Sequence, residues 1–312
     1  MDRNVFKGVS GGFFMAIPLL ERWRGGEFTL GVHRAGNSIA GLSRIQELRG
    51  SVPLQPKFSL AVEGDLKWCD EGKNTIFYFY HGGGFGEEVL NRAEVGRLQK
   101  EGKVLLLEDA FDLSESLLYN FDLRRRAGSK EALEKAFSIC DKNGRLNDIW
   151  VSAFDLNTLR QVKEVCPEVP TMFLSFFSPS YSTYLHQPSF KMPRSWGFVS
   201  VGDLGDVDIV TTWPRGYLSP RDFTNFPFGA VMGTQKVWDT AFHPRDYSSR
   251  RRIIGEALAL EEHNKFSFPG DFTSLKGARK YYELVENTGL RVAGVYCADI
   301  PESLEAFWEK RN

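Results

Sequence analysis

The sequence has few cysteines, and none of them falls in a metal-binding or disulfide pattern. A structural zinc site needs closely spaced pairs such as CxxC, and a disulfide scaffold needs many cysteines in a short chain. Neither arrangement is present, so we exclude both classes and expect free thiols in a reducing compartment, which predicts a cytoplasmic protein. The four cysteines are Cys69, Cys140, Cys166 and Cys297.

Long apolar segments and a strong excess of one charge are also lacking. No run approaches the roughly 18 apolar residues that a membrane-spanning helix needs. The apolar stretch Val9–Leu20 is interrupted by Gly11, Gly12 and Pro18, and no small-residue cleavage site follows it. We therefore expect neither a transmembrane segment nor a secretion signal. The formal net charge of −1 argues against a nucleic-acid partner, because no basic field is present.

What the chain does have is a repeated alternation of short apolar runs with helical patterns. This order indicates βαβ units and a parallel sheet, and 312 residues suit one α/β domain. We therefore predict a single-domain (β/α)8 TIM barrel, with residues 1–27 as an N-terminal lead-in. A hairpin appendage, formed with the extended run Thr75–Tyr80, is expected after the second strand.

The expected barrel strands are Phe28–His33, Phe58–Leu66, Val104–Glu108, Asp148–Phe154, Thr171–Phe177, Val207–Trp213, Phe228–Gly233 and Arg291–Ala298. The expected helices are Leu42–Arg49, Glu87–Gln99, Ser114–Leu123, Ser129–Asp141, Leu156–Val165, Tyr247–Asn264 and Ser274–Asn287, with a closing helix from Glu302.

Several of the early apolar runs end on ionisable residues. They are His33, the pair Glu63 and Asp65, His81 and Glu108. A buried strand gains nothing from a charge at its end unless that end opens into a site, and in parallel barrels the carboxyl ends of the strands are where sites lie. We therefore expect these five side chains to form one constellation.

The three acids suit a hard divalent cation. Glu63 and Asp65 are two positions apart, which places them on one face of a strand. Together with Glu108 they offer the oxygen ligands that Mg²⁺ or Ca²⁺ prefers. The alternative is that they are solvated acids at the ends of strands, with no metal between them.

The chain contains five histidines, and two of them, His33 and His81, flank the acid pair in the sequence. One imidazole can accept a proton while another gives one, as a phosphoryl- or acyl-transfer step requires. Arg34, next to His33, could hold a phosphate through two parallel hydrogen bonds; a surface ion pair is the alternative. We interpret His33 and His81 as candidate catalytic residues and Arg34 as a candidate phosphate ligand.

These motifs resemble those of the glycerophosphodiester phosphodiesterases. His33 and Arg34 are similar to the family's opening His-Arg, and Glu63 and Asp65 to its Glu-x-Asp motif. His81 lies where a second histidine follows the hairpin, and Leu107-Glu108 is similar to the family's Glu-x-Lys strand. The stretch Ala298–Pro301 resembles its Thr-Asp-x-Pro. The resemblance implies a TIM barrel that hydrolyses or rearranges phosphodiesters with a divalent cation and two histidines.

The chain also departs from that pattern. Gly36, Asn37 and Ser38 replace the family's Pro-Glu-Asn-Thr, Gly82 follows His81 where the family has Asp, and Ala110 replaces a lysine. The Tyr-His-Gly around His81 is similar to that of sphingomyelinase D and phospholipase D relatives. The substrate is therefore expected to be a glycerophosphodiester or a sugar phosphate ester, cleaved or transferred.

Two other interpretations stay open at this stage. One is a phosphodiester-forming synthase similar to agrocinopine synthase, in which a sugar hydroxyl replaces water. The other is a catalytically inactive binding barrel of the same fold. Aromatic residues that could stack on a sugar, or simply pack in the core, are Phe176, Phe177, Trp213, Phe226 and Phe228.

Overall fold

The structure is a computed structural model of the 312-residue chain. It describes residues 18–51, 57–71, 74–82, 88–114, 116–123, 130–175, 207–212, 261, 264, 266–269, 275–297, 301 and 304. The expectations for Phe228–Gly233, for the helix from Glu302, for the five candidate stacking aromatics and for almost all of Tyr247–Asn264 lie outside the described residues.

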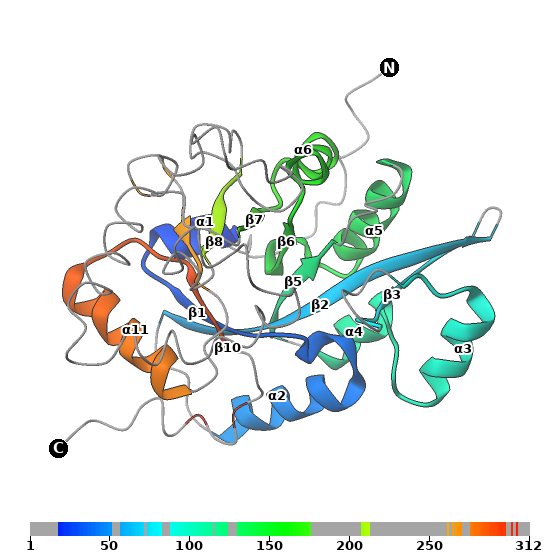
Figure 1. The fold of residues 1–312 in the computed structure, drawn as a ribbon, viewed down its shortest axis with the longest axis horizontal. Helices are drawn as coiled ribbons and strands as arrows, with labels where there is room; N and C mark the ends of the chain where they lie inside the picture. Colours follow the sequence, from blue (N-terminus) through cyan, green and yellow to red (C-terminus); the bar gives the residue numbers. More distant parts are fainter. Residues whose placement is uncertain are drawn as a thin grey trace, which may run out of the picture.

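A ring of parallel strands forms the centre of the molecule (Figure 1). Neighbouring strands follow the order β10-β1-β2-β5-β6-β7-β8-β9, and every pair along this path is parallel. Their bounds are β1 Phe28–Val32, β2 Phe58–Glu71, β5 Leu118–Asp122, β6 Ile149–Ala153, β7 Thr171–Ser175, β8 Ile209–Thr212, β9 Phe266–Ser267 and β10 Gly294–Cys297.

The two ends of this path meet. Ser267 in β9 forms a parallel bridge with Val292, two residues before β10 begins. The amide of Ala293 donates to the carbonyl oxygen of Ser267 at 3.0 Å, and the amide of Tyr296 donates to that of Pro269 at 3.0 Å. The described strands therefore close into an eight-stranded parallel barrel, which confirms the predicted TIM barrel.

The predicted hairpin appendage is also confirmed. Strand β2 runs on past the barrel, and its second half pairs antiparallel with β3 (Asn74–Phe79), from Leu66 opposite Phe79 to Glu71 opposite Asn74. A two-residue strand, β4 (Leu105–Leu106), pairs antiparallel with β3. The hairpin projects from the side of the barrel (Figure 1).

Two expected elements were wrong. Val104–Glu108 is not a barrel strand, because β4 ends at Leu106 and helix α4 (Leu107–Leu113) follows at once. Ser114–Leu123 is not a helix, because it contains β5, the barrel strand next to β2. All five residues of β5 are buried, so this strand lacks the exposed face of a half-exposed strand. Strand β9 was not predicted, and two residues are too few to give a pattern.

Most of the described helices follow strands and cover the outside of the barrel, whereas α1 precedes β1 and α3 packs against the hairpin. Their bounds are α1 Leu19–Arg24, α2 Ile39–Ser51, α3 Arg92–Lys100, α5 Lys130–Lys142, α6 Leu156–Val165 and α11 Leu275–Thr288, with 3-10 turns η1 Ala35–Asn37 and η2 Leu146–Asp148. Helix α3 begins with a capping box between Asn91 and Glu94, and α6 begins with Asp155 accepting from the amide of Thr158. These caps fix the helix starts where the side chains satisfy the first amides.

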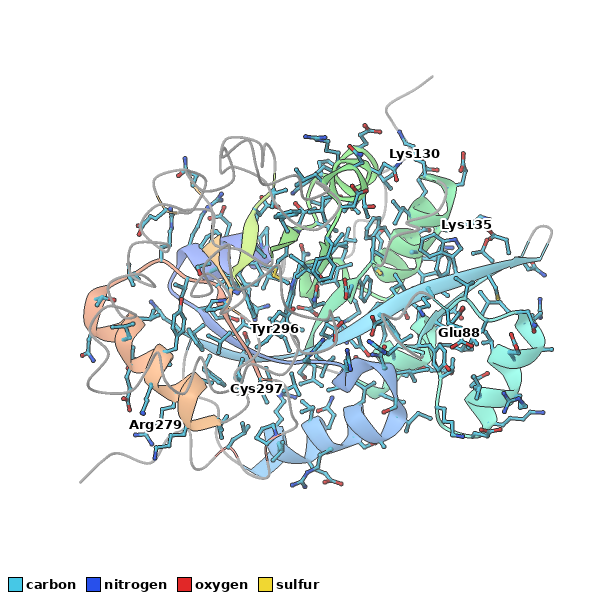
Figure 2. The ribbon with its side chains drawn as sticks, viewed as in Figure 1. Glu88, Lys130, Lys135, Arg279, Tyr296 and Cys297 are labelled. Atoms are coloured by element: carbon cyan, nitrogen blue, oxygen red, sulfur yellow. The ribbon has the colours of Figure 1, made fainter. Side chains whose placement is uncertain are left out.

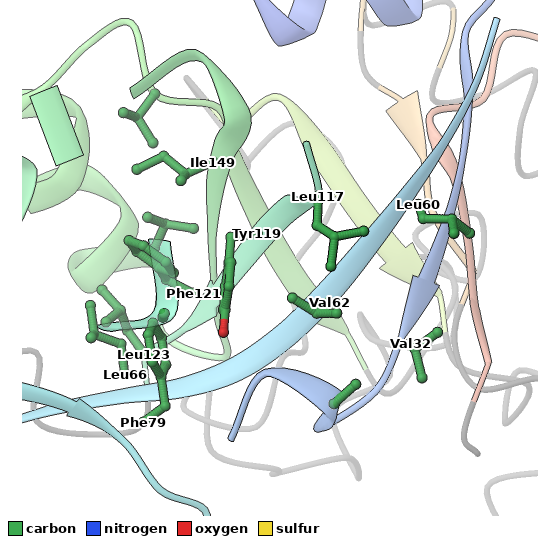
Figure 3. Close-up of a cluster of buried hydrophobic side chains, with 14 of the residues drawn as sticks. Val32, Leu60, Val62, Leu66, Phe79, Leu117, Tyr119, Phe121, Leu123 and Ile149 are labelled. Carbon is green, nitrogen blue, oxygen red and sulfur yellow. The ribbon is translucent and has the colours of Figure 1, made fainter. Parts of the chain in front are cut away.

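The core has two layers, one on each side of the barrel wall. The outer layer, between the strands and the helices, contains Val62, Tyr119 and Phe121 (Figure 3). The inner layer fills the barrel and contains Leu118, Trp150, Met172, Phe268 and Tyr296, together with Leu19 and Trp23 of α1. Figure 2 places Tyr296 near the middle of the barrel. Several of the inner residues lie early in their strands, so α1 closes the amino-terminal end of the barrel.

Among the described residues, no helix is both long enough and apolar enough to cross a membrane.

Candidate metal and phosphodiester site

Three carboxylates meet at the carboxyl end of the barrel. They belong to Glu63, Asp65 and Asp122, whose ligand oxygens lie within 4.8 Å of one another. All three side chains are buried, with 3%, 0% and 2% of their residue surface exposed. The parallel register of β2 and β5 brings them together, because it pairs Asp65 with Asp122.

The sequence Glu63-Gly64-Asp65 suits this arrangement because of what packs behind it. Glu63 and Asp65 point to the inside of the barrel, so the residue between them points outward. There a β-carbon on Gly64 would lie 2.7 Å from the ring of Phe79, which is too close for any side chain. Glycine at this position lets the β3 hairpin pack tightly against β2.

The turn after β1 holds two of the three acids. The side-chain Nδ2 of Asn37 donates to Oδ2 of Asp65 at 2.8 Å, and its side-chain Oδ1 accepts from the backbone amide of Asp65 at 2.8 Å. The backbone amide of Arg34 donates to Oε2 of Glu63 at 2.5 Å. Arg34 adopts a left-handed conformation with φ of 60°, which turns this amide towards the carboxylate.

Tyr119 supports the same turn from outside the barrel. Its hydroxyl donates to the carbonyl oxygen of Gly36 at 3.0 Å, and a β-carbon on Gly36 would lie 2.7 Å from the tyrosine ring. Complete burial raises the pKa of Tyr119 well above its ordinary value, so the phenol keeps its proton and remains a donor. Gly36 is required here because the ring fills the space.

The two candidate histidines follow different strands. His33 directly follows β1, is half-buried, and has its Nε2 3.8 Å from Oε2 of Glu63. His81 follows β3, and its Nδ1 lies 3.0 Å from the carbonyl oxygen of Gly82. Because a carbonyl oxygen can only accept, Nδ1 of His81 carries a proton and its Nε2 is the nitrogen able to accept one.

The side chain of Arg34 has spare donor capacity. Its Nε is buried and has no hydrogen-bond partner among the described residues. A buried guanidinium nitrogen without an acceptor is costly unless something else supplies one. An oxygen of an anionic ligand is an acceptor of the kind that this nitrogen binds.

Glu108 is not part of the carboxylate group. It lies in the first turn of α4 and is exposed, whereas Asp122 ends β5 beside Asp65. Sequence reasoning missed Asp122 because its strand was interpreted as a helix. A signal was present: Asp122, Leu123 and Arg124 repeat the acid-x-base spacing of the Glu-x-Lys motif with a shorter acid and a different base. Arg124 lies outside the described residues.

Asp122 is held in turn by polar residues inside the barrel. Ser152 on β6 donates its hydroxyl to Oδ1 of Asp122 at 3.5 Å, and Asn120 donates to the hydroxyl oxygen of Ser152 at 2.9 Å. Three buried carboxylates with fixed orientations repel one another in the absence of a counter-charge. Their oxygens fit a hard divalent cation, which accepts several carboxylate ligands.

The fold and the acidic mouth together define a TIM barrel with a candidate cation site at its carboxyl end. No protein-family model matches the sequence, and no curated protein matches it either. Solved structures do, and at the level of fold the chain is similar to the glycerophosphodiester phosphodiesterases.

Three solved structures carry this likeness. A protein from Galdieria sulphuraria, assigned as a glycerophosphodiester phosphodiesterase, has 16% identity and a TM-score of 0.53, over 90% of this chain and 97% of its own. A glycerophosphodiester phosphodiesterase from Parabacteroides distasonis has 12% identity and a TM-score of 0.52, over 90% and 98%. A phosphodiesterase from Oleispira antarctica, solved with the product sn-glycerol-3-phosphate, has 12% identity and a TM-score of 0.52, over 92% and 99%.

Proposed function

We propose that this protein is a divalent-cation-dependent enzyme that cleaves or transfers a phosphodiester. The observation that carries the proposal is the group of three buried carboxylates at the carboxyl end of a barrel shared with glycerophosphodiester phosphodiesterases. A buried acidic group placed where barrel active sites lie indicates a site rather than a structural feature.

In this proposal Glu63, Asp65 and Asp122 hold Mg²⁺ or Ca²⁺, with Asp122 taking the place first expected for Glu108. A bound cation there would neutralise charge on the phosphate oxygens. Arg34 binds the phosphate through its buried guanidinium edge. These groups fix the phosphate between His33 and His81.

The two histidines then move protons. In one direction Nε2 of His81 takes the proton from the incoming hydroxyl, and a protonated His33 gives one to the leaving alkoxide; the opposite assignment uses the same geometry. Glu63 lies 3.8 Å from Nε2 of His33, so the imidazole faces the carboxylate group.

The substrate class is a small phosphodiester, either a glycerophosphodiester or a sugar phosphodiester. The first is supported by the sn-glycerol-3-phosphate bound in the Oleispira antarctica enzyme. A synthase that passes the phosphate to a sugar hydroxyl uses the same residues with a different acceptor. A catalytically inactive barrel is less well supported, because it has no need for three buried carboxylates.

The decisive experiment compares Asp122→Asn with Glu108→Gln. We expect Asp122→Asn to lower turnover at least about 100-fold and weaken cation binding, since it removes one anionic ligand. Glu108→Gln is the matched control, and its turnover should stay within about twofold of the wild-type rate, as is usual for a surface change. Turnover is measured on bis(p-nitrophenyl) phosphate, a glycerophosphodiester panel, and sugar plus sugar-phosphate donor mixtures.

The same assays test the need for a cation. Activity should disappear with EDTA and return with Mg²⁺ or Ca²⁺, and calorimetry should show one cation site in the wild type. The proposal fails if no substrate is turned over under any of these conditions, or if EDTA leaves the rate unchanged.

A further inference from the structure

A buried lysine follows the carboxylate pair on β2 and has no role in the chemistry proposed above. Lys67 lies two positions beyond Asp65, in the part of β2 that pairs with β3, and strand alternation gives it the same side of β2 as Glu63 and Asp65. It is only 6% exposed. Lysine is almost never buried to this degree unless its ammonium has partners.

The ammonium of Lys67 contacts the two ends of one chain segment. Its Nζ donates to the carbonyl oxygen of Glu88 at 2.5 Å and to that of His81 at 3.4 Å. The same Nζ lies 5.4 Å from the centre of the Tyr80 ring, in a cation–π contact. His81 and Glu88 flank residues 82–87, so one ammonium joins the beginning of this segment to its end.

Further contacts join the same two ends. Tyr80 and Glu88 also interact, because burial, followed by the charge of Glu88, raises the pKa of Tyr80. Gly82 has φ of +71°, and a β-carbon there would lie 3.0 Å from Oε2 of Glu88. The amide of Tyr80 donates to the carbonyl oxygen of Asp65 at 3.1 Å, which ties this corner directly to the carboxylate strand.

The sequence of the segment is rich in glycine, since residues 82–86 are Gly, Gly, Gly, Phe and Gly. Glycine loses more backbone entropy on ordering than any other residue. Charge-assisted hydrogen bonds to backbone carbonyls are about twice as strong as neutral ones, so the contacts of Lys67 with His81 and Glu88 favour one arrangement of these two described residues.

We propose that Lys67 is a positioning residue that fixes His81 against the carboxylates by joining His81 to Glu88. The inference rests on the proposed function, because it assigns Lys67 to the placement of a candidate catalytic histidine. Lys67 itself does not move a proton or bind the cation in this proposal. It acts through the backbone of the residue that does the chemistry.

The first test uses Lys67→Met, which keeps most of the aliphatic volume and removes the charge. We expect kcat to fall roughly 10–100-fold, the size expected when a catalytic group is displaced by about 1 Å, with KM within about threefold. Cation affinity by calorimetry should not weaken, because Lys67 is not a ligand. Lys57→Met is the matched control; Lys57 is exposed and bonds the carbonyl oxygen of Gly25, away from the site.

The second test is independent of turnover. Hydrogen exchange of the amides of His81, Gly82 and Glu88 should be at least about tenfold faster in Lys67→Met than in wild type, since about 1.4 kcal/mol of local stability corresponds to that factor. Lys67→Arg keeps a cation and should recover part of both the rate and the protection. If Lys67→Met does not fold, the Lys67→Arg enzyme carries both measurements, with a smaller expected loss.

A third comparison separates positioning from other roles. Lys67→Met combined with His81→Ala should be no slower than His81→Ala alone, because residues acting as one unit are non-additive. Additive losses, unchanged exchange at His81 and Glu88, or a raised KM at unchanged kcat each overturn the positioning role. If His81→Ala is fully active, the proposed function fails at that histidine, while the exchange measurement still decides whether Lys67 joins the two ends.

Discussion

The two ends of the barrel interior are formed by the same strands, but one is lined by apolar side chains and the other by charged and polar ones. On β2 the inward residues change from Ala61 to Glu63 and Asp65, and on β6 they change from Trp150 to Ser152. At the amino-terminal end, α1 supplies Trp23, whose ring meets Trp150 edge-on with centroids 5.7 Å apart. At the carboxyl end, three carboxylates lie within 4.8 Å of one another.

The difference separates what holds the barrel together from what it does. Apolar side chains at one end remove surface from water, which is the main favourable term in folding. Charged side chains at the other end cost free energy to bury and are retained only where something binds. One end should therefore respond to mutation in stability, and the other in activity and cation binding.

The largest expected effect is on catalysis at the carboxyl end. His33→Ala and His81→Ala should each lower kcat roughly 10²–10⁴-fold, the usual contribution of a general acid or base. The melting temperature by circular dichroism should change little, because both side chains are only half-buried.

The other three histidines are the controls for this comparison. His186→Ala, His243→Ala and His263→Ala should leave kcat within a few-fold, because the sequence gives them no place in the site. Near wild-type turnover by His33→Ala or His81→Ala would end the two-histidine mechanism, even with the barrel and cation site intact.

The next largest effect is on stability at the amino-terminal end. Trp23→Ala should lower the unfolding free energy by about 3–5 kcal/mol, the usual cost of truncating a buried aromatic residue. It also removes the hydrogen bond from Trp23 Nε1 to the hydroxyl of Thr29. Urea unfolding measures the loss, and the cation affinity of the folded fraction should be unchanged.

Trp68→Ala makes the same chemical change at a half-buried site on the hairpin, where the ring packs against Phe77. It should cost clearly less than Trp23→Ala. Equal losses for the two variants would contradict the assignment of α1 as the closure of the barrel.

Much of the fold and part of the candidate site could be predicted from the sequence. The alternation of runs and helices predicted the barrel, and the placement of Glu63 and Asp65 two residues apart predicted their shared face. His33 and Arg34 were proposed as site residues because they follow a clear apolar strand. Each of these features depends on local periodicity, which a sequence displays directly.

The parts that were missed depend on contacts between distant residues. Asp122 joins the site only because β5 pairs in register with β2, and the run Leu118–Asp122 is buried on both faces. Asn37 orients Asp65 across 28 positions of sequence, and its role follows from the turn geometry rather than from its residue type. The burial of Lys67 could not be predicted from the sequence, because it depends on contacts with the carbonyl groups of His81 and Glu88.

The smallest expected effect is on stability at the carboxyl end, and its sign is the sharpest test of the comparison. Glu63→Gln removes one of three neighbouring charges but keeps an amide oxygen that can accept from the amide of Arg34. In EDTA the variant should be as stable as wild type or more stable by about 1 kcal/mol, the energy of two like charges about 4 Å apart in water. With cation at about 100 times the wild-type Kd, wild type gains about 2.7 kcal/mol, while the variant binds more weakly and gains less. The order of the two melting temperatures should therefore reverse between EDTA and cation.

Glu47→Gln, at an exposed position on α2, should show no reversal. If Glu63→Gln is less stable in EDTA and binds the cation as tightly as wild type, the carboxylates are structural and the contrast between the two ends of the barrel does not hold.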